Sequence, residues 1–357
     1  MTWDAMAEFD HEQVSYFHDE ETGLRCVIGI YDTRLGPALG GTRIWDYDSE
    51  EDALQDVLRL SKGMAYKAAA ADLDLGGGKA VIMGDPDEIK TEQLLRTYGR
   101  AVQSLNGRYI TAEDVNTEVA DMDTVAEECD YVVGLSAGLG NPSPVTAHGV
   151  FHGMKACLHH VYGDPSVDGV SVLVQGVGKV GAALVETLVE NGADVKVSDI
   201  DTDAVEEMVD TYGVEAVDPD DVYTEECDVF APCALGGVIN DDTIPGLQCD
   251  IVAGSANNVL AERRHATELE DRGILYAPDY VINAGGLITV HAEMEGRSKE
   301  DARDETENIH GRLEDIIEKS GEEDISTVEA ADEYAQERMQ DAEGKRFKTL
   351  SHGEIDV

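Results

Sequence analysis

Two lysines have sequence neighbours that could change their chemistry. Lys67 follows a tyrosine and precedes four alanines, and Lys79 follows three consecutive glycines. A lysine with such neighbours is poorly hydrated, which lowers its pKa and prepares it to bind a carboxylate or to act as a base. The alternative is that both side chains extend to solvent along their aliphatic stems.

One acidic residue is placed where it could work beside such a base. Asp114 lies within residues 110–116, just after the expected end of a strand, where a carboxylate could face a cleft. Taken alone, Asp114 or the neighbouring Glu113 is more often a helix cap or a loop acid. Asp114 is therefore a candidate proton-transfer group.

A glycine-rich turn indicates a second kind of chemistry. Its six residues are Gly176, Val177, Gly178, Lys179, Val180 and Gly181. The glycines permit a tight turn and the close approach of a pyrophosphate to a helix N-terminus, and Asp199, which ends the next strand, can accept from ribose hydroxyls. A plain glycine turn is the alternative, but strand, helix and acid in register predict dinucleotide binding. Asp199 favours NAD, because the 2′-phosphate of NADP would meet its negative charge, although NADP remains possible.

The elements around this turn predict an α/β domain. Strands are expected at residues 170–174 and 194–198, and helices at 178–191 and 202–212. This alternation implies a parallel sheet with helices on its faces.

The first part of the chain mixes strand and helix patterns. Strands are expected at residues 26–31 and 80–84, and helices at 51–64 and 91–105, the second with Thr91 as its N-cap. Residues 138–144 form the richest turn cluster and are the best hinge candidate. Because 357 residues exceed what one hydrophobic core usually serves, we expect two domains.

The charge of the chain excludes one class of partner. It has 75 acidic and 26 basic residues, which give a net charge of −49 spread through the sequence. Duplex nucleic acid is an unsuitable partner because binding phosphates needs a basic surface. Self-repulsion of this size destabilises a compact state unless salt screens it, so we expect a protein adapted to a high-salt cytoplasm.

Several other features bound the location and the chemistry. No stretch approaches the roughly 20 apolar residues of a membrane span, and the N-terminus lacks the pattern of a secretion signal, so we expect a cytoplasmic protein with no membrane partner. The six cysteines contain no C-x-x-C pair and are expected to be reduced. The histidines show no H-E-x-x-H spacing, and we expect no metal.

A competing motif surrounds Ser136. Residues 134–138 match the G-x-S-x-G pattern of serine hydrolases, in which the serine lies on a sharp turn between a strand and a helix. Here the motif runs into a second turn cluster where that helix should begin. A serine hydrolase is therefore kept only as an outside alternative.

Eight blocks of sequence together resemble the glutamate, leucine, phenylalanine and valine dehydrogenase superfamily, most closely its leucine dehydrogenases. The blocks are residues 36–43 (GPALGGTR), 63–67 (GMAYK), 75–79 (LGGGK), 109–114 (YITAED), 140–146 (GNPSPVT), 231–236 (APCALG), 254–258 (GSANN) and 278–286 (PDYVINAGG). The resemblance implies an α/β protein with a substrate-binding and assembly domain at residues 1–137 and a Rossmann-type NAD-binding domain at 138–295. It also implies a helical C-terminal segment at 296–357 that packs back on the first domain.

The same resemblance implies roles for individual residues. Lys67 would bind the substrate α-carboxylate with Gly40 beside it, and hydride transfer from Cα to the nicotinamide would leave an iminium. Lys79 would then activate a water as general base, and Asp114 would protonate the departing ammonia. Thr146 and Asn258 would orient the nicotinamide and ribose side of the cofactor. The apolar pocket for the substrate side chain would be Leu39, Met64, Ala112, Leu287 and Val290.

The function expected from this resemblance is the reversible, NAD-dependent oxidative deamination of a small apolar L-amino acid of the leucine or valine type. The alternatives are the same reaction on phenylalanine or glutamate, and, further away, an inactive nucleotide-binding regulator. The implied pocket has no lysine to meet a distal carboxylate, which disfavours glutamate. The family also implies a homo-oligomer, commonly a hexamer or an octamer.

Overall fold

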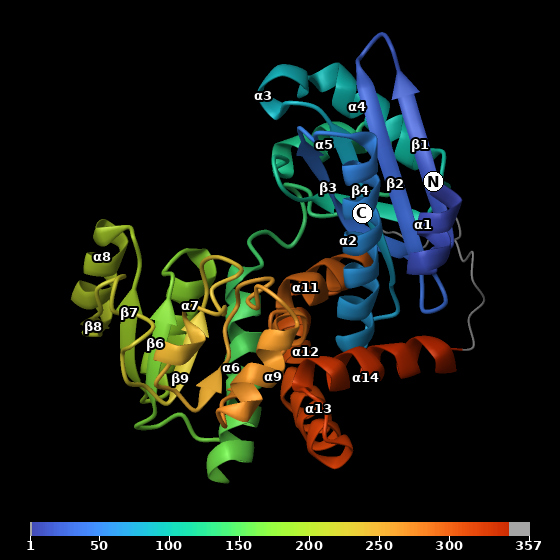
Figure 1. The fold of residues 1–357 in the computed structure, drawn as a ribbon. Coiled ribbons are helices and arrows are strands. Elements are labelled where there is room, and N and C mark those ends of the chain that lie inside the picture. Colours follow the sequence, from blue (N-terminus) through green and yellow to red (C-terminus); the bar gives the residue numbers. More distant parts are fainter. Residues whose placement is uncertain (1, 343–357) are drawn as a thin grey trace. The chain divides into compact units, whose positions relative to one another are not determined.

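The chain folds into two compact units, each containing one β-sheet (Figure 1). The structure is a computed structural model that describes residues 2–342. The first unit contains the chain up to Gly140, Val290–Ser298 and the residues from Ala335 on; the second contains Asn141–Thr289 and Lys299–Tyr334. The boundary at Gly140 falls within the turn cluster that the sequence indicates as a hinge.

The first unit is built on a mixed five-stranded sheet in the order β1-β2-β4-β3-β5. Its strands are β1 (Gln13–Asp19), β2 (Leu24–Asp32), β3 (Ala38–Trp45), β4 (Gly76–Met83) and β5 (Tyr109–Glu113). Strand β2 is antiparallel to β1 and β4, whereas β3 is parallel to β4 and β5. The parallel strands β4, β3 and β5 therefore run side by side, with Lys79 within β4 and Asp114 directly after β5.

Helices cover this sheet. They are α1 (Thr2–Phe9), α2 (Glu50–Ala70), α3 (Pro86–Ile89), α4 (Glu92–Gln103) and α5 (Val119–Ala126). Ser49 caps α2 by accepting from the amide of Asp52, and Leu54, Val57 and Leu58 face the sheet in a fully buried cluster. Thr91 is confirmed as the cap of α4, because its hydroxyl accepts from the amide of Leu94 at 3.2 Å.

Strand β4 begins earlier than the sequence predicts. The expected strand at residues 80–84 starts at Gly76, so Lys79 lies within the strand and not before it. Glycine disfavours strands, but a side chain at position 77 would overlap the backbone of α2 at Ser61 and Ala65. The glycine run thus allows α2 to lie directly on the strand that carries Lys79.

The second unit is built on a parallel six-stranded sheet in the order β11-β10-β9-β6-β7-β8. Its strands are β6 (Ser171–Gln175), β7 (Asp194–Ser198), β8 (Glu215–Ala216), β9 (Val229–Pro232), β10 (Ile251–Val252) and β11 (Leu275–Tyr276). Counted from β6, this order is 6-5-4-1-2-3, the arrangement of dinucleotide-binding sheets. The predicted parallel sheet is confirmed.

Helices of the second unit flank this sheet. They are α6 (Ser143–Tyr162), α7 (Lys179–Glu190), α8 (Thr202–Tyr212), a 3-10 turn (Ile244–Gly246), α9 (Arg264–Asp271), α10 (Asp279–Ile282), α12 (Lys299–Thr306) and α13 (Ile309–Glu323). Among the helices in the described part of the chain, none combines the length and the apolar character needed to cross a membrane.

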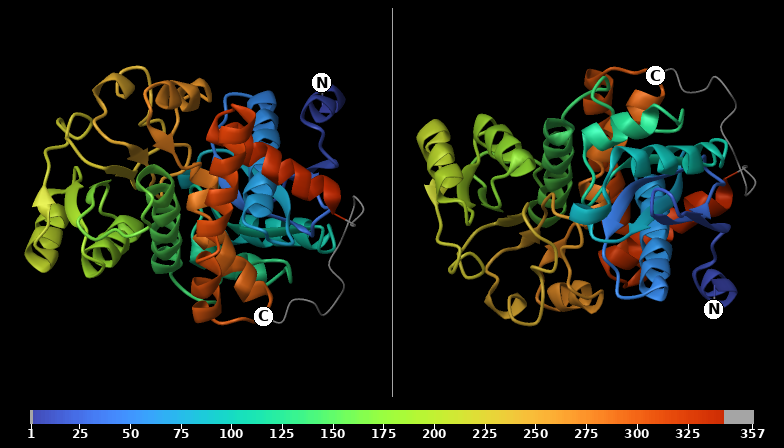
Figure 2. Two further views of the ribbon diagram at one scale, coloured as in Figure 1. Left: turned by 90° about the horizontal axis from the view of Figure 1, so that it is seen from below. Right: turned by 90° about the horizontal axis from the view of Figure 1, so that it is seen from above.

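The C-terminal helices are divided between the two units, whereas the resemblance implies a segment that packs back on the first domain. Helices α12 and α13 pack against α6 within the second unit, where Ile309 and Leu313 are fully buried (Figure 1, Figure 2). Helices α11 (Gly285–Met294) and α14 (Thr327–Asp341) are each divided between the two units. In the first unit Arg338 donates to the carbonyl of Leu73 at 2.8 Å. Of the predicted segment, residues 296–298 and 335–342 belong to the first unit, and residues 343–357 lie outside the described part.

Candidate active site and dinucleotide-binding turn

Lys79 and Asp114 form a close ion pair in the first unit. Lys79 Nζ lies 2.9 Å from Asp114 Oδ2, and Lys79 is only 4% exposed. The two residues come from β4 and from the end of β5, which are separated in the sheet by β3. Between them β3 contains Gly40 and Gly41, and a Cβ at Gly41 would lie 2.7 Å from the Cβ of Asp114. Two small residues in the intervening strand therefore leave room for the side chains to meet.

The ion pair continues into a network of charged groups. Arg43 Nε donates to the same oxygen, Asp114 Oδ2, at 3.0 Å, and Arg43 also donates to Asp56 on α2 at 2.9 Å. Tyr47 donates to Asp56 at 2.6 Å. The carboxylate of Asp114 thus meets a lysine and an arginine at once, while Arg43 is held by a second carboxylate.

Burial and charge act in opposite directions on this pair. Desolvation lowers the pKa of Lys79 below its ordinary value, and the charge of Asp114 opposes this effect only in part. For Asp114, desolvation works to raise the pKa, but the charges of Lys79 and Arg43 outweigh it and the pKa is lowered. Lys79 therefore loses its proton more easily than a free lysine does. The neighbouring carboxylate of Asp114 stays ionised.

The backbone at Asp114 is fixed by neighbouring hydroxyls. Thr117 Oγ1 accepts from the amide of Asp114 at 2.8 Å and lies 2.9 Å from the carbonyl of Thr42, to which it can donate. Behind the strands, the hydroxyls of Thr42, Thr111 and Tyr98 form a fully buried hydrogen-bonded group. These contacts hold the ends of β3 and β5 in register, which limits the movement of the acid.

The other predicted substrate residues lie around the same sheet, apart from one. The Gly40 carbonyl accepts from the hydroxyl of Tyr109 at 2.6 Å, and Lys67 lies half-buried in the last turn of α2. Of the predicted pocket residues, Leu39 is buried, whereas Met64, Ala112 and Val290 are half-buried in the first unit. Leu287 is buried in the second unit.

The glycine-rich turn lies at the end of β6 in the second unit. Gly176 has φ +98°, a backbone conformation that residues with side chains rarely adopt. A side chain at Gly181 would overlap the carbonyl oxygen of Gly176, so this glycine permits the tight entry into α7. Gly178 is exposed, and a Cβ there would meet nothing within 4 Å. The space beside Gly178, at the N-terminus of α7, fits a phosphate group.

Asp199 is tied to this turn by its own carboxylate. Its Oδ2 accepts from the amide of Val177 at 2.8 Å, and its Oδ1 accepts from the amide of Asp201 at 2.9 Å. Lys179 is exposed and Val180 half-buried in the first turn of α7. The predicted glycines and the predicted acid are therefore joined by a direct hydrogen bond.

The turn also lies at the point where the strand order reverses. A Cβ on Gly176, after β6, would lie 2.6 Å from the Cβ of Ala234, after β9. In open α/β sheets, ligands bind outside the carboxyl ends of the strands at such a point. The glycine-rich turn therefore lies at this point of the sheet.

The two remaining predicted cofactor residues lie elsewhere in the second unit. Thr146 is in the first turn of α6, and its hydroxyl donates to the carbonyl of Pro142 at 3.2 Å. Asn258 is exposed in a loop after β10 with φ +52°, and its carbonyl accepts from the amide of Gly237 at 2.7 Å. The exposed amide side chain of Asn258 is thus available to a ligand.

Ser136 does not occupy the setting that a hydrolase nucleophile needs. It lies exposed in a turn, its amide donates to Asp123 at 3.0 Å, and the next helix begins only at Ser143. A nucleophile elbow leads directly from its serine into a helix. This geometry disfavours the serine hydrolase alternative.

The sequence reasoning missed three groups of residues. Arg43 was quoted only within a block of resemblance, although it binds Asp114, and Thr117 was not considered. A cluster of His148, His152 and Glu307 in the second unit was also overlooked. The four-residue spacing of the two histidines was the available signal, because residues i and i+4 of a helix share one face.

Comparison with known proteins shows the family of the chain. Residues 11–131 match the dimerisation domain of the Glu/Leu/Phe/Val dehydrogenases, and residues 196–353 match the Glutamate/Leucine/Phenylalanine/Valine dehydrogenase family. The chain is 50% identical to leucine dehydrogenase of Bacillus subtilis over 351 residues, which are 98% of this chain and 96% of that protein. It is 49% identical to valine dehydrogenase of Streptomyces virginiae over 338 residues, 93% of this chain and 94% of that one.

A solved structure extends the comparison to the fold. The crystal structure of L-tryptophan dehydrogenase from Nostoc punctiforme has 45% sequence identity and a TM-score of 0.89, over 96% of this chain and 99% of that one. Identity of this size over nearly the full length shows the family: the chain belongs to the Glu/Leu/Phe/Val dehydrogenases.

Proposed function

We propose that this protein catalyses the reversible, NAD-dependent oxidative deamination of a leucine- or valine-type L-amino acid to the 2-oxo acid and ammonia. The observation that carries the proposal is the buried ion pair of Lys79 and Asp114, 2.9 Å apart. A buried lysine with a lowered pKa beside an ionised carboxylate is suited to move protons during deamination.

The general class of reaction follows from the family. The chain is an amino-acid dehydrogenase that acts on the CH–NH2 group of an apolar amino acid. NAD, when bound, takes up the hydride released from Cα of the substrate. The remaining steps are proton transfers and binding contacts, for which residues of the first unit are suited.

Each residue of the first unit has a proposed part in those steps. Lys67 binds the α-carboxylate of the substrate, beside the backbone of Gly40. Lys79, in its neutral form, takes a proton from the water that attacks the iminium carbon. Asp114, which is ionised at rest, accepts the proton that Lys79 has taken from the water and gives it to the amine nitrogen as ammonia departs. Arg43 binds the carboxylate of Asp114, and Thr117 binds its backbone amide.

The proposed substrate preference rests on the apolar side chains of the proposed substrate pocket. Leu39, Met64, Ala112 and Val290 are apolar and lie in the first unit, and Leu287 is the fifth residue of the proposed pocket. No lysine is among them to pair with a distal carboxylate, so we expect glutamate to be a poor substrate. Leucine and valine differ by one methylene, a difference worth only about 1–3 kcal/mol in an apolar pocket.

NAD is proposed as the preferred cofactor because of Asp199. The turn at residues 176–181 leaves space beside Gly178 for the pyrophosphate, and the carboxylate of Asp199 stands where it can accept from ribose hydroxyls. A 2′-phosphate would add negative charge beside this carboxylate. Thr146 and Asn258 are proposed to orient the nicotinamide half.

A spectrophotometric assay at about 340 nm, where the reduced nicotinamide absorbs, tests the proposal. It compares L-leucine, L-valine, L-phenylalanine and L-glutamate, first with NAD and then with NADP. We expect reduction of NAD with leucine or valine as the best substrates. Equal or faster turnover of glutamate would contradict the proposed pocket, and no turnover of any of the four by folded protein would favour the inactive regulator.

We also propose a cytoplasmic homo-oligomer, a hexamer or an octamer. Residues 11–131 match a dimerisation domain, and Trp3, Tyr16 and Trp45 expose large aromatic surfaces in the first unit. Exposed aromatic side chains are typical of interfaces between subunits. The mass in solution, measured by light scattering during size-exclusion chromatography, distinguishes these assemblies from a monomer.

Adaptation to high salt is a separate proposal that rests on the net charge of −49. Screening by salt weakens repulsion among the carboxylates, so we expect the melting temperature to rise steeply from dilute buffer to multimolar potassium chloride. The matched control is potassium glutamate at equal ionic strength, which tests whether screening or the particular anion is responsible. Equal melting temperatures at low and high salt would refute the adaptation.

A further inference from the structure

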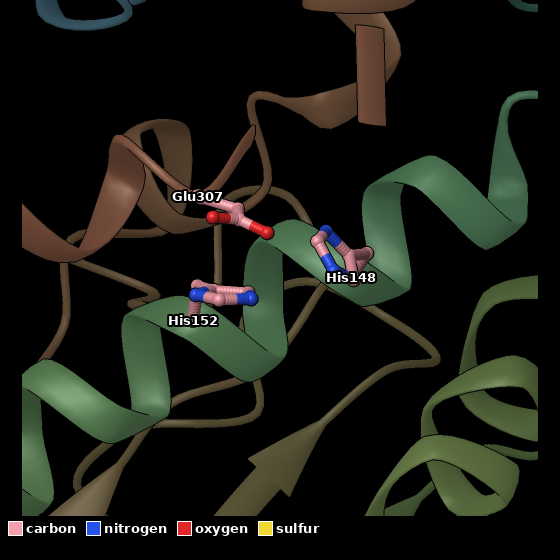
Figure 3. A group of neighbouring side chains, drawn as sticks. All are labelled: His148, His152 and Glu307. Carbon is pink, nitrogen blue, oxygen red and sulfur yellow. The ribbon is translucent and has the colours of Figure 1, made fainter. Parts of the chain in front are cut away.

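A cluster of possible metal ligands lies in the second unit, apart from the dinucleotide-binding turn. His148 and His152 are one turn apart on α6, and Glu307 lies between α12 and α13 (Figure 3). One ligand atom from each residue lies within 4.8 Å of the other two. The two imidazole rings stand side by side, with centroids 4.5 Å apart, and the carboxylate faces them (Figure 3).

The hydrogen bonds around His148 determine which of its ring nitrogens has a free lone pair. His148 Nδ1 lies 2.9 Å from Thr306 Oγ1, and the single proton of that hydroxyl is donated to the carbonyl of Arg303 at 2.6 Å. The hydroxyl must therefore accept from His148, which places the ring proton on Nδ1. Nε2 is then unprotonated and available as a ligand, the arrangement in which a second hydrogen bond orients a metal-binding histidine.

His152 is also suited to bind a metal. Within residues 2–342, no side chain forms a hydrogen bond with either of its ring nitrogens. Among the described residues, the ring nitrogens of His152 are therefore left for a metal ion.

We propose that His148, His152 and Glu307 form a binding site for Zn²⁺, with water as the fourth ligand. Two imidazoles and one carboxylate are a ligand set that zinc accepts, with bonds of about 2.0–2.2 Å. Tetrahedral donors at such bond lengths stand roughly 3.4 Å apart. Atoms that already lie within 4.8 Å of one another reach that spacing through small side-chain rotations. This proposal revises the expectation, drawn from the histidine spacing, that the protein has no metal site.

The consequence for the fold is a link between helices. The histidines belong to α6, and Glu307 belongs to the turn that joins α12 to α13, which both pack on α6. A bound ion would connect these elements and stabilise the folded second unit by mass action. Arg303 and Lys155 are nearby cations that weaken the attraction for Zn²⁺, so we expect weaker binding than in a site with four protein ligands.

Two similar groups of side chains are explained by direct contacts. In the group of His159, His310 and Glu314, the carboxylate lies 2.7 Å from one ring and 3.3 Å from the other, as in a pair of hydrogen-bonded ion pairs. In the group of Asp241, His265 and Glu268, both carboxylates bind Arg264, at 2.7 and 2.5 Å. The rings and carboxylate of the His148 cluster have no such direct contacts with one another among the described residues.

Calorimetric titration of the full-length protein with zinc chloride tests the site. The protein is first treated with EDTA and dialysed, and an excess of magnesium chloride is present, because Mg²⁺ occupies carboxylate sites but competes poorly for imidazole. We expect about one Zn²⁺ per chain. Glu307→Gln, which changes an exposed residue, and His152→Gln should each lower the affinity at least about tenfold, as losses of metal ligands do.

The controls separate this site from the rest of the acidic surface. His160→Gln and Glu314→Gln change a histidine of the same helix and a carboxylate of the neighbouring group, and we expect wild-type affinity from both. The visible absorption of bound Co²⁺, used as a second probe, should weaken in Glu307→Gln while circular dichroism shows an unchanged fold. Absence of Zn²⁺ binding by the wild type, unchanged affinity in Glu307→Gln, or a loss in Glu314→Gln instead would overturn the proposal.

Discussion

The Lys79–Asp114 pair and the turn at residues 176–181 achieve their chemical properties by different means. The pair depends on side chains, because burial and neighbouring charges set the protonation of Lys79 and Asp114. The turn depends on backbone, because the absence of side chains at its glycines shapes the space at the N-terminus of α7. A substitution should therefore affect the first site through charge and the second through bulk.

The largest effect is expected at the side-chain site. Lys79→Ala removes the proposed base, and general acid–base catalysis contributes about 10²–10⁴-fold, so kcat should fall by that factor while the Kd of NAD stays nearly unchanged. The control is Lys90→Ala, which removes a half-buried lysine that pairs with Asp121 at 3.1 Å. Steady-state kinetics and NAD titration measure both quantities. A Lys79→Ala enzyme that keeps more than about a tenth of the wild-type kcat excludes Lys79 as the base.

At the backbone site, bulk should reduce cofactor binding and stability together. Gly181→Val forces a side chain against the carbonyl of Gly176, and such overpacking costs roughly 1–3 kcal/mol, so both the melting temperature and NAD affinity should fall. Gly178→Ala is the matched variant, because its methyl group meets nothing within 4 Å in the structure. It should weaken NAD binding at an unchanged melting temperature. Wild-type stability in Gly181→Val would show that α7 moves away without cost.

The pH dependence of deamination separates the side-chain site from the turn, because the charges of Asp114 and Arg43 act on the pKa of Lys79 in opposite directions. The base must be neutral, so deamination should increase as pH rises through the lowered pKa of Lys79. Asp114 raises this pKa and Arg43 lowers it. Asp114→Asn should therefore shift the acidic limb of the kcat/KM profile to lower pH, with a reduced maximum, and Arg43→Gln should shift it to higher pH. Gly178→Ala should leave the limb in place. Shifts of both charge variants in the same direction would contradict the assignment of the limb to Lys79.

The smallest effect is expected from Asp199, the charged residue beside the turn at residues 176–181. Asp199→Asn removes the negative charge but keeps an oxygen that can accept from the amide of Val177. Two like charges about 4 Å apart near solvent repel by roughly 1 kcal/mol, so the preference for NAD over NADP should decrease about fivefold. The ratio of kcat/KM values measures it, and Asp201→Asn is the control. An unchanged ratio would mean that Asp199 does not select the cofactor.

The two sites also differ in how well the sequence predicts them. The turn and Asp199 belong to consecutive elements of one βαβ unit, so local spacing alone indicates their contact. Lys79 and Asp114 come from strands that are separated by β3, and their contact depends on a strand order that no local pattern contains. Local sequence marks Lys79 and Asp114 as candidates one by one, but only the resemblance pairs them in one reaction. Arg43 was missed because its partners lie after β5 and on α2.

Other differences have similar causes. The early start of β4 at Gly76 opposes local propensity, since glycine disfavours strands, and it follows from the close packing of α2. The distribution of the C-terminal helices depends on the apolar residues Ile309 and Leu313, whose burial beside α6 no short-range pattern specifies. Tertiary packing therefore decided the points at which the sequence was ambiguous or misleading.

The hydrogen bonds of Asp199 have a consequence for the entropy of NAD binding. Both carboxylate oxygens already accept from backbone amides, so the side chain has lost its rotamer freedom before any ligand arrives. Immobilising a side chain on binding costs about 0.5–1.5 kcal/mol. The Asp199 side chain loses this freedom when the second unit folds, so the free energy of NAD binding does not include the loss. Each carboxylate oxygen keeps a lone pair for a ribose hydroxyl. Recognition of the ribose thus begins from a carboxylate that is already ordered.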